Sequence, residues 1–153
     1  MPLIRPLLPQ EAPPLALLQQ ANPSLVALEA DLKAGVCHVL SHGAEPILGA
    51  AIMQQVALNT QEIMAIAICP SAQGQGLGKR LLAYLIDTAH AQGATTVFVG
   101  TANSSLNQLG FYQKAGFRLS HIVPNYFIDH YPDPIIENGL RALDMVYLKH
   151  TRP

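Results

Sequence analysis

Three glycines alternate in the segment Gln73-Gly74-Gln75-Gly76-Leu77-Gly78-Lys79, which follows an apolar run and opens an amphipathic one. Glycine adopts positive φ easily and lets the backbone approach a ligand closely. The first turn of a helix leaves backbone N–H groups without partners, and the helix dipole adds partial positive charge there. The segment therefore predicts a site for phosphate oxygens, with Lys79 and Arg80 as nearby cations. A glycine-rich turn without a ligand is the alternative.

The spacing of these glycines excludes two common nucleotide-binding patterns. The dinucleotide pattern G-x-G-x-x-G requires a glycine at position 79, where this chain has lysine. The Walker pattern G-x-x-x-x-G-K-[ST] requires glycine at 73 and Ser or Thr at 80, where the chain has Gln73 and Arg80. The phosphate therefore belongs to a different kind of ligand.

Apolar spacing and turn-forming residues predict the elements that position this turn. Helices are expected over residues 9–21, 25–34, 77–92 and 105–115. Ser24 is the candidate N-cap of the second helix, and Ser105 and Gln108 have the spacing of a capping box for the last. Strands are expected over residues 3–8, 36–40, 47–56, 63–68, 95–99, 117–123 and 143–148, with a proline-rich connection over 126–140.

This order of elements predicts a mixed α/β fold. The strands at 63–68 and 95–99 are joined through the long helix that follows the glycine turn, so we expect them to be parallel. A chain of 153 residues, half of them hydrophobic, fits a single domain spanning 1–153.

Composition excludes several classes of partner. The formal net charge is −1 and no block of Lys and Arg occurs, so nucleic acid is not expected as a partner. No run of 18 apolar residues predicts a membrane span, and the proline-broken N-terminus does not read as a signal peptide. Two isolated cysteines, Cys37 and Cys69, fit a reducing cytoplasm. The histidines form no metal-binding pattern, so no metal is expected.

The glycine turn and two later segments resemble the GCN5-related N-acetyltransferase (GNAT) superfamily. The turn has the spacing Q/R-x-x-G-x-G/A after a strand and Pro70, and a Leu-rich helix follows it. Asn103 follows the next strand, and Phe111-Tyr112-Gln113-Lys114-Ala115-Gly116-Phe117 resembles the family's F-Y-x-K-x-G-F segment. The resemblance covers residues 47–153 and implies a mostly antiparallel sheet with a splayed, parallel central strand pair, flanked by helices.

The resemblance implies acetyl-CoA as the co-substrate. The amides of the turn would hold its pyrophosphate, and backbone amides near Ala67 and Ile68 would bind the pantetheine and the thioester oxygen. Asn103 would hydrogen-bond the pantetheine or cap the following helix, and Asn107 would cap that helix or contact the cofactor. Cofactor contacts are expected at Ile66, Ala67, Ile68, Gln73, Gly74, Gln75, Gly76, Leu77, Gly78, Lys79, Asn103 and Asn107.

In this family an amine attacks the thioester directly, so the site needs a base for the ammonium proton and an acid for the leaving thiolate. The resemblance assigns the acid to Tyr112, which could instead pack in the core. Glu62, at the start of the central strand, is the candidate base; an ordered water could replace it, and Glu62 would then be an ordinary exposed acid.

The C-terminal quarter is the candidate acceptor segment. Its four acids and three interleaved aromatic residues would suit a cationic amine, although a solvated loop explains them equally well. They are Asp129, Asp133, Glu137, Asp144, Tyr126, Phe127 and Tyr131. The run 131–139 resembles a bacterial subgroup of the superfamily whose acceptors are mostly unassigned.

The leading hypothesis is an N-acetyltransferase that acts on a primary amine of a small molecule or peptide. A non-catalytic acyl-CoA-binding module and a transferase that uses another acyl-CoA, such as succinyl-CoA, are the alternatives. The presence of both Asn103 and Tyr112 favours an enzyme. Many members of the superfamily are homodimers, so the resemblance allows a homodimer here.

Overall fold

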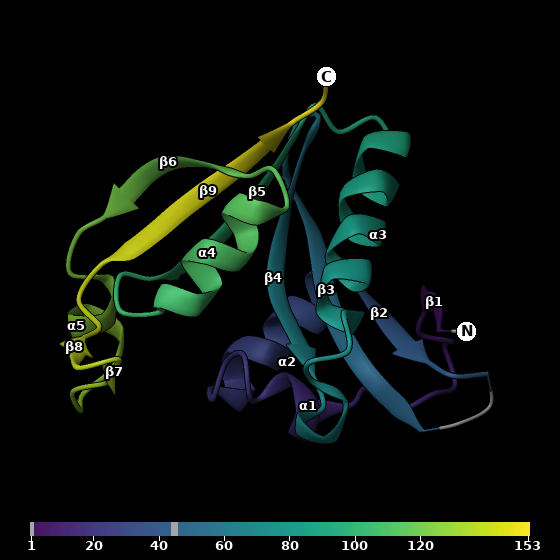
Figure 1. Ribbon diagram of the computed structural model, residues 1–153, viewed down its shortest axis with the longest axis horizontal. Coiled ribbons are helices and arrows are strands. Elements are labelled where there is room, and N and C mark those ends of the chain that lie inside the picture. Colours follow the sequence, from purple (N-terminus) through teal and green to yellow (C-terminus); the bar gives the residue numbers. More distant parts are fainter. Residues whose placement is uncertain (1, 44–45) are drawn as a thin grey trace.

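Seven strands form one sheet in the computed structural model, which describes residues 2–43 and 46–153. Their order across the sheet is β1-β2-β3-β4-β5-β9-β6, and every neighbouring pair is antiparallel except β4 and β5, which are parallel (Figure 1). This confirms the predicted mixed sheet with a parallel central pair. The strands are β1 (Leu3–Pro6), β2 (Val36–Ser41), β3 (Ile47–Ala57), β4 (Thr60–Ile68), β5 (Thr96–Ala102), β6 (Arg118–Val123) and β9 (Met145–Thr151).

Helices cover both faces of this sheet. One face carries α3 and α4, and the opposite face carries α1 and α2 (Figure 1). A short helix, α5, and a two-stranded hairpin of β7 and β8 lie between β6 and β9 in the chain. The helices are α1 (Leu15–Leu18), α2 (Leu25–Ala34), α3 (Leu77–Ala91), α4 (Leu106–Lys114) and α5 (Tyr126–His130); a 3-10 turn, η1, spans Pro70–Ala72, and the hairpin strands are β7 (Ile136–Glu137) and β8 (Leu140–Arg141).

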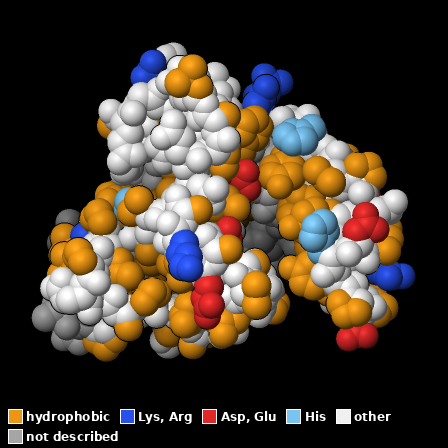
Figure 2. Space-filling model, turned by 180° about the vertical axis from the view of Figure 1, so that it is seen from behind, with side chains coloured by type: hydrophobic (Ala, Val, Ile, Leu, Met, Phe, Trp, Pro, Cys, Tyr) orange, Lys and Arg blue, Asp and Glu red, His pale blue; other side chains and the backbone are white. Residues whose placement is uncertain are grey.

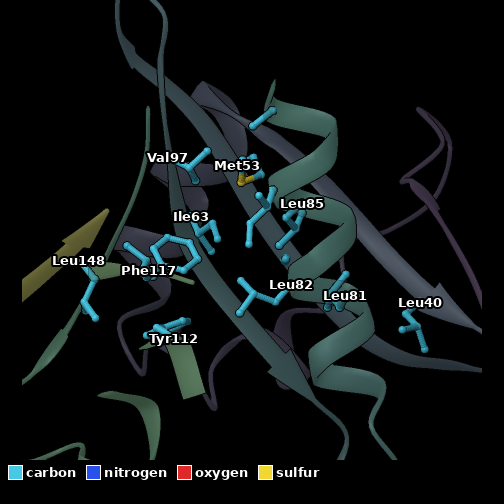
Figure 3. Packing of buried hydrophobic residues seen from close by; sticks show 14 of the residues in the cluster. Leu40, Met53, Ile63, Leu81, Leu82, Leu85, Val97, Tyr112, Phe117 and Leu148 are labelled. Atoms are coloured by element: carbon cyan, nitrogen blue, oxygen red, sulfur yellow. The ribbon is translucent and has the colours of Figure 1, made fainter. Parts of the chain in front are cut away.

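The larger core lies under α3. Leu82 and Leu85 of this helix lie on the side of Ile63 of β4 and Val97 of β5, and Leu81 lies nearer Leu40 of β2 (Figure 3). Their spacing of one, three and four residues places them on one helical face, as the sequence predicts. This packing fixes the start of α3, and with it the glycine turn, against the end of β4. A second core on the opposite face holds α1 and α2 against β2, β3 and β4.

Strand β4 changes its pairing in the middle of the sheet. Ala65 pairs with Ile52 and Ile63 pairs with the next residue of β3, so Met64 is an extra residue in the ladder, a β-bulge. The parallel pairing with β5 also ends here, at Ile63 opposite Val99. Beyond this point the two strands diverge, and the two halves of the sheet form a V (Figure 1). The expected splay is confirmed.

Several predicted elements differ from the observed ones. Residues 9–21 form only the single turn of α1, because Pro9, Pro13 and Pro14 have no N–H group to donate to a helical ladder. The segment 126–140, expected to be a connection, contains α5, β7 and the first residue of β8. Within the described residues, no helix is long and apolar enough to cross a bilayer.

The two predicted helix caps have different outcomes. Ser24 is the N-cap of α2, and its hydroxyl oxygen accepts a hydrogen bond from the Ala27 N–H at 3.2 Å. Ser105 occupies the N-cap position of α4, but its hydroxyl makes no capping bond. It donates instead to Glu137 at 2.9 Å, so the predicted capping box is wrong. The hydroxyl thus links the start of α4 to the β7–β8 hairpin and accepts no hydrogen bond from the helix amides.

Candidate active site

A cleft of about 940 Å³ lies where β4 and β5 diverge. Figure 2 views the face that carries α1 and α2, and it shows a hollow between this part of the molecule and the lobe formed by α5, β7 and β8. The cleft is lined by β4 from Glu62 to Ile68, by the glycine turn and the start of α3, and by β5 and α4. Residues of α2, α5 and β9 complete it. It therefore connects the glycine turn to the C-terminal segment.

The glycine turn has the geometry expected of a phosphate site. Gly74 and Gly76 have φ of 80° and 78°, and a Cβ built on either would meet no atom within 4 Å. Gly76 is the N-cap of α3, so the first amides of this 15-residue helix face open space. Gln73 secures the turn by donating from Nε2 to the Ile68 carbonyl at 3.0 Å. Gly78 differs, because a Cβ built on it would be in ordinary contact with Phe111 at 3.5 Å and Ile68 at 3.6 Å.

Most of the predicted cofactor contacts line this cleft. They are Ile66, Ala67, Ile68, Gln73, Gly74, Gly76, Leu77, Gly78, Lys79 and Asn107. Two of the predicted residues, Gln75 and Asn103, are not among the residues that line it. Gln75 is exposed at the tip of the turn, between the two glycines of positive φ.

The side chain of Asn103 binds the backbone that leads into β9. Its Oδ1 accepts hydrogen bonds from the N–H groups of Leu143 at 2.8 Å and Asp144 at 3.0 Å, and its Nδ2 donates to the Arg141 carbonyl at 3.1 Å. These bonds occupy both ends of the amide. The geometry favours a positioning role over the expected helix cap, and contact with pantetheine stays a prediction.

Tyr112 lies at the floor of the cleft. The side chain is 5% exposed and packs against Phe111 and Phe117, with ring centroids 5.4 Å and 5.8 Å away (Figure 3). Among the described residues, the Tyr112 hydroxyl has no hydrogen-bond partner. No fully buried side-chain oxygen of these residues lacks a partner, so this oxygen is not fully buried. The hydroxyl therefore opens onto the cleft. Burial raises the pKa of the phenol well above its usual value, so it stays protonated.

Glu62 faces the opposite side of the sheet from α3. Its neighbour Ile63 is buried under α3, and successive strand residues point to opposite faces. Glu62 is half-buried and lines the cleft together with Asp31 of α2. Burial raises the pKa of the Glu62 carboxyl, and the negative charge of Asp31 raises it further. Burial also raises the pKa of Asp31.

Aromatic side chains of the C-terminal segment form the wall opposite these acids. Tyr126, Phe127 and Tyr131 line the cleft as expected, and Tyr147 of β9 joins them. Burial raises the pKa of Tyr147 to about 12, and the nearby Glu62 charge adds to this shift. The ring of Tyr147 is covered on one side by His121, stacked at 4.8 Å.

The predicted acidic cluster is not assembled at the cleft. Of its four members only Glu137 lines it, and this carboxylate accepts hydrogen bonds from the hydroxyls of Ser104 at 3.3 Å and Ser105 at 2.9 Å. Asp144 accepts from the Asn125 N–H at 2.9 Å, and Asp129 and Asp133 are exposed. The segment that the sequence predicted to be one loop forms α5 and the β7–β8 hairpin, and these elements hold the four acids apart.

Sequence reasoning missed Asp31 and Tyr147. Asp31 is three residues after Leu28, which is fully buried, so the helical periodicity of 25–34 places an acid near the packing face. That signal was available. Tyr147 lies in β9 and reaches the cleft only through the pairing of β9 with β5, which the sequence does not display. Within the described residues, no group of three or more His, Cys, Asp or Glu could hold a metal ion.

A V-shaped sheet with a glycine turn and a helix start at one end of the opening and a protonated phenol within it is the architecture of acyltransferases that use coenzyme A thioesters. A protein-family model for the acetyltransferase (GNAT) family matches residues 7–117. The chain belongs to the GNAT acetyltransferase family.

Proteins similar to this chain in sequence and in structure support its place in the GNAT family. The uncharacterized N-acetyltransferase YvbK of Bacillus subtilis (strain 168) is 39% identical over 132 residues, which are 86% of this chain and 84% of YvbK. A GNAT family acetyltransferase from Elizabethkingia anophelis, solved with acetyl-CoA bound, is 35% identical with a TM-score of 0.95, over 99% of this chain and 98% of that one. A Bacillus subtilis acetyltransferase solved with CoA is 35% identical with a TM-score of 0.93 over the whole of both chains.

Proposed function

We propose that this protein transfers the acetyl group of acetyl-CoA directly to a primary amine of a small molecule or peptide. The observation that carries the proposal is the placement of Tyr112 and Glu62 in one cleft that begins at the glycine turn. The acetyl-CoA bound to the Elizabethkingia relative supports the choice of donor. A single domain spanning 1–153 would hold all of these parts.

The cleft suits an elongated thioester. The amides at the start of α3 and the open backbone at Gly74 and Gly76 would bind the pyrophosphate, with Lys79 adding charge. Beyond Ile63 the edge of β4 that faces β5 has no strand partner, so those amides within 66–68 that point to this edge would bind the pantetheine and the thioester oxygen. This arrangement would bring the acyl carbon between Tyr112 and Glu62.

The two ionisable groups would divide the proton transfers. A primary ammonium must lose a proton before it can attack, and the raised pKa of Glu62 makes this carboxylate a stronger base than an exposed one. The amine nitrogen then forms a bond to the acyl carbon as the carbon–sulfur bond breaks. Tyr112 donates its proton to the leaving thiolate. The attacking nitrogen loses its second proton as the neutral amide forms, and this proton restores the Tyr112 phenol through solvent. The proton held by Glu62 leaves with solvent, so the reaction releases one proton in all.

The proposal is tested by incubating the purified protein with acetyl-CoA and a panel of amines and peptides. Release of free thiol would be followed by absorbance, and the acetylated product would be identified by mass spectrometry. We expect amine-dependent thiol release and one N-acetyl product per thiol. Acetyl-CoA binding without product from any amine would instead favour a non-catalytic module. Faster turnover of succinyl-CoA would favour another acyl donor.

Compartment and assembly are secondary parts of the proposal. The two free thiols, Cys37 and Cys69, agree with a reducing compartment, and we place the protein in the cytoplasm. A homodimer stays an expectation from the family, and sedimentation of the purified chain would test it.

A further inference from the structure

Three carboxylates line the cleft: Glu137, which accepts hydrogen bonds from Ser104 and Ser105, and the two acids Glu62 and Asp31, which have no protein cation beside them among the described residues. Glu62 comes from β4 and Asp31 from α2, which covers the same face of the sheet. Among the described residues that line the cleft, Lys79 is the only lysine or arginine, and it belongs to the glycine turn. The described part of the chain contains one ion pair, between Arg5 and Glu11, outside the cleft.

Asp31 is held in place by the packing of its helix. Ser24 caps α2, and Leu28 fixes the helix against the sheet by complete burial. Ala27, one turn before Asp31, lines the same cleft, so the two residues form one stripe along the helix. Asp31 is half-buried on this stripe and has no hydrogen-bond partner among the described side chains.

The two acids and the aromatic wall line one cleft, and their pKa shifts agree with this placement. Burial is the main cause of the raised pKa of Glu62 and of Tyr126 on α5; the charge of Asp31 adds to the first shift, and the charges of Tyr131, Asp31 and Glu62 add to the second. All three groups line the same cleft, and charge effects between them fade with distance where solvent can enter. Two partly desolvated carboxylates without a counter-ion are unfavourable, and a cationic ligand would relieve the repulsion.

Tyr112 links this space to the reacting atoms. Its side chain is almost completely buried, and its hydroxyl points into the same cleft without a protein partner. The cleft between Tyr112 and the two acids is therefore open to a ligand. Tyr126 and Tyr147 would offer aromatic surface to that ligand, which favours a cation.

We infer that Asp31 binds a second positive charge on the acceptor, while Glu62 serves the amine that is acetylated. The preferred acceptors are then aliphatic amines that carry another cationic group, of which diamines are the simplest. This inference rests on the proposed acetyl transfer and specifies its substrate class. Asp31 is a specificity-determining residue here and takes no part in proton transfer.

The test compares diaminopropane, diaminobutane and diaminopentane with the monoamine of the same chain length. The wild-type protein should acetylate at least one diamine with kcat/KM at least about tenfold above its monoamine, which corresponds to roughly 1.4 kcal/mol of transition-state stabilisation. Asp31→Asn should abolish this preference by raising KM for the diamine, with kcat and the Kd for acetyl-CoA nearly unchanged. Glu29→Gln, which removes an exposed acid of the same helix, should change nothing.

The outcomes separate this inference from the function on which it rests. Equal kcat/KM for diamines and monoamines, or a preference that survives Asp31→Asn, would overturn the role of Asp31 and leave acetyl transfer intact. A loss of acetyl-CoA affinity in Asp31→Asn would show that the residue acts on the structure of the cleft, and would also overturn its role. No acetylation of any amine by the wild-type protein would overturn both.

Discussion

The ring of Tyr147 lies directly over the bare Cα of Gly100, because β9 and β5 pair these two residues side by side. A Cβ built on Gly100 would be 3.0 Å from Tyr147 Cε1 and 2.9 Å from Met145 Sδ. Both glycine and tyrosine line the cleft. The lack of a side chain at Gly100 therefore determines the position of the Tyr147 ring in the aromatic wall of the cleft.

Gly100→Ala should displace this wall. The added methyl overpacks the site, so we expect a loss of about 1–3 kcal/mol in the free energy of unfolding and a higher KM for the amine. Denaturant unfolding and steady-state kinetics would measure the two effects. The stability cost should shrink in a Met145→Ala background, where the nearer contact is absent. Gly110→Ala is the matched control, since its Cβ would meet no atom within 4 Å and should stabilise α4. Equal effects at both glycines would contradict the packing described.

Tyr112→Phe should remove the proton donor and leave the packing against Phe111 and Phe117 in place. We expect kcat to fall about 10²-fold, with little change in KM for acetyl-CoA. Thermal unfolding should be almost unaffected, because the hydroxyl has no protein partner to lose. A kcat equal to that of the wild-type protein would exclude Tyr112 as the acid.

Glu62→Gln should lower kcat/KM for the amine about 10²-fold at neutral pH and remove the acid-side fall of the pH–rate profile. In the wild-type protein activity should decline as the pH drops through the raised pKa of this carboxyl. If the decline persists unchanged in Glu62→Gln, another group or a bound water is the base.

The same substitution should stabilise the fold at neutral pH. The folded-state pKa of Glu62 lies above its unfolded value, so the folded protein binds more protons between the two. Ionised Glu62 therefore lowers stability, and this loss sets in as the pH rises through that interval. Glu62→Gln should raise Tm at neutral pH and give no advantage below the unfolded pKa. Thermal scans across pH would check the sign, and a lower Tm at neutral pH would contradict it.

Asn103→Ala should loosen the entry to β9. Three hydrogen bonds to the backbone of 141–144 are lost, which we expect to cost about 1–3 kcal/mol of stability and to raise KM for the amine. Calorimetric titration of acetyl-CoA separates the two roles considered for this residue. An unchanged Kd indicates positioning of the acceptor side, and a Kd raised tenfold or more would indicate direct contact with pantetheine.

The cofactor side of the cleft could be predicted from local sequence because its parts are local. The glycine turn and the end of β4 lie within 66–79, and the turn needs only positive φ and a helix start, which Gly74 and Gly76 supply. The strand order in this region follows from one crossover through α3. These features depend on neighbours in the chain, so spacing predicted the turn and the helix start, while the family resemblance supplied the ligand.

The acceptor side could not be predicted in this way because it is assembled across the sheet. Asp31 and Tyr147 meet Glu62 through the packing of α2 and the pairing of β9 with β5. The acids between 129 and 144 were close in sequence, and the fold of α5 and the hairpin separated them. Asn103 matched a family position, but its side chain is engaged with 141–144, 38 or more residues away.

Direct transfer is tested most closely by a single-turnover experiment with the protein in excess over acetyl-CoA labelled in the acetyl group. After addition of an acceptor amine and rapid quenching, we predict label in the N-acetylated amine at the rate of thiol release, with no label on the protein at any time. Tyr112→Phe and Glu62→Gln should slow both rates together. Label that first appears covalently on the protein, or thiol release without labelled amine, would contradict direct attack of the amine on the thioester.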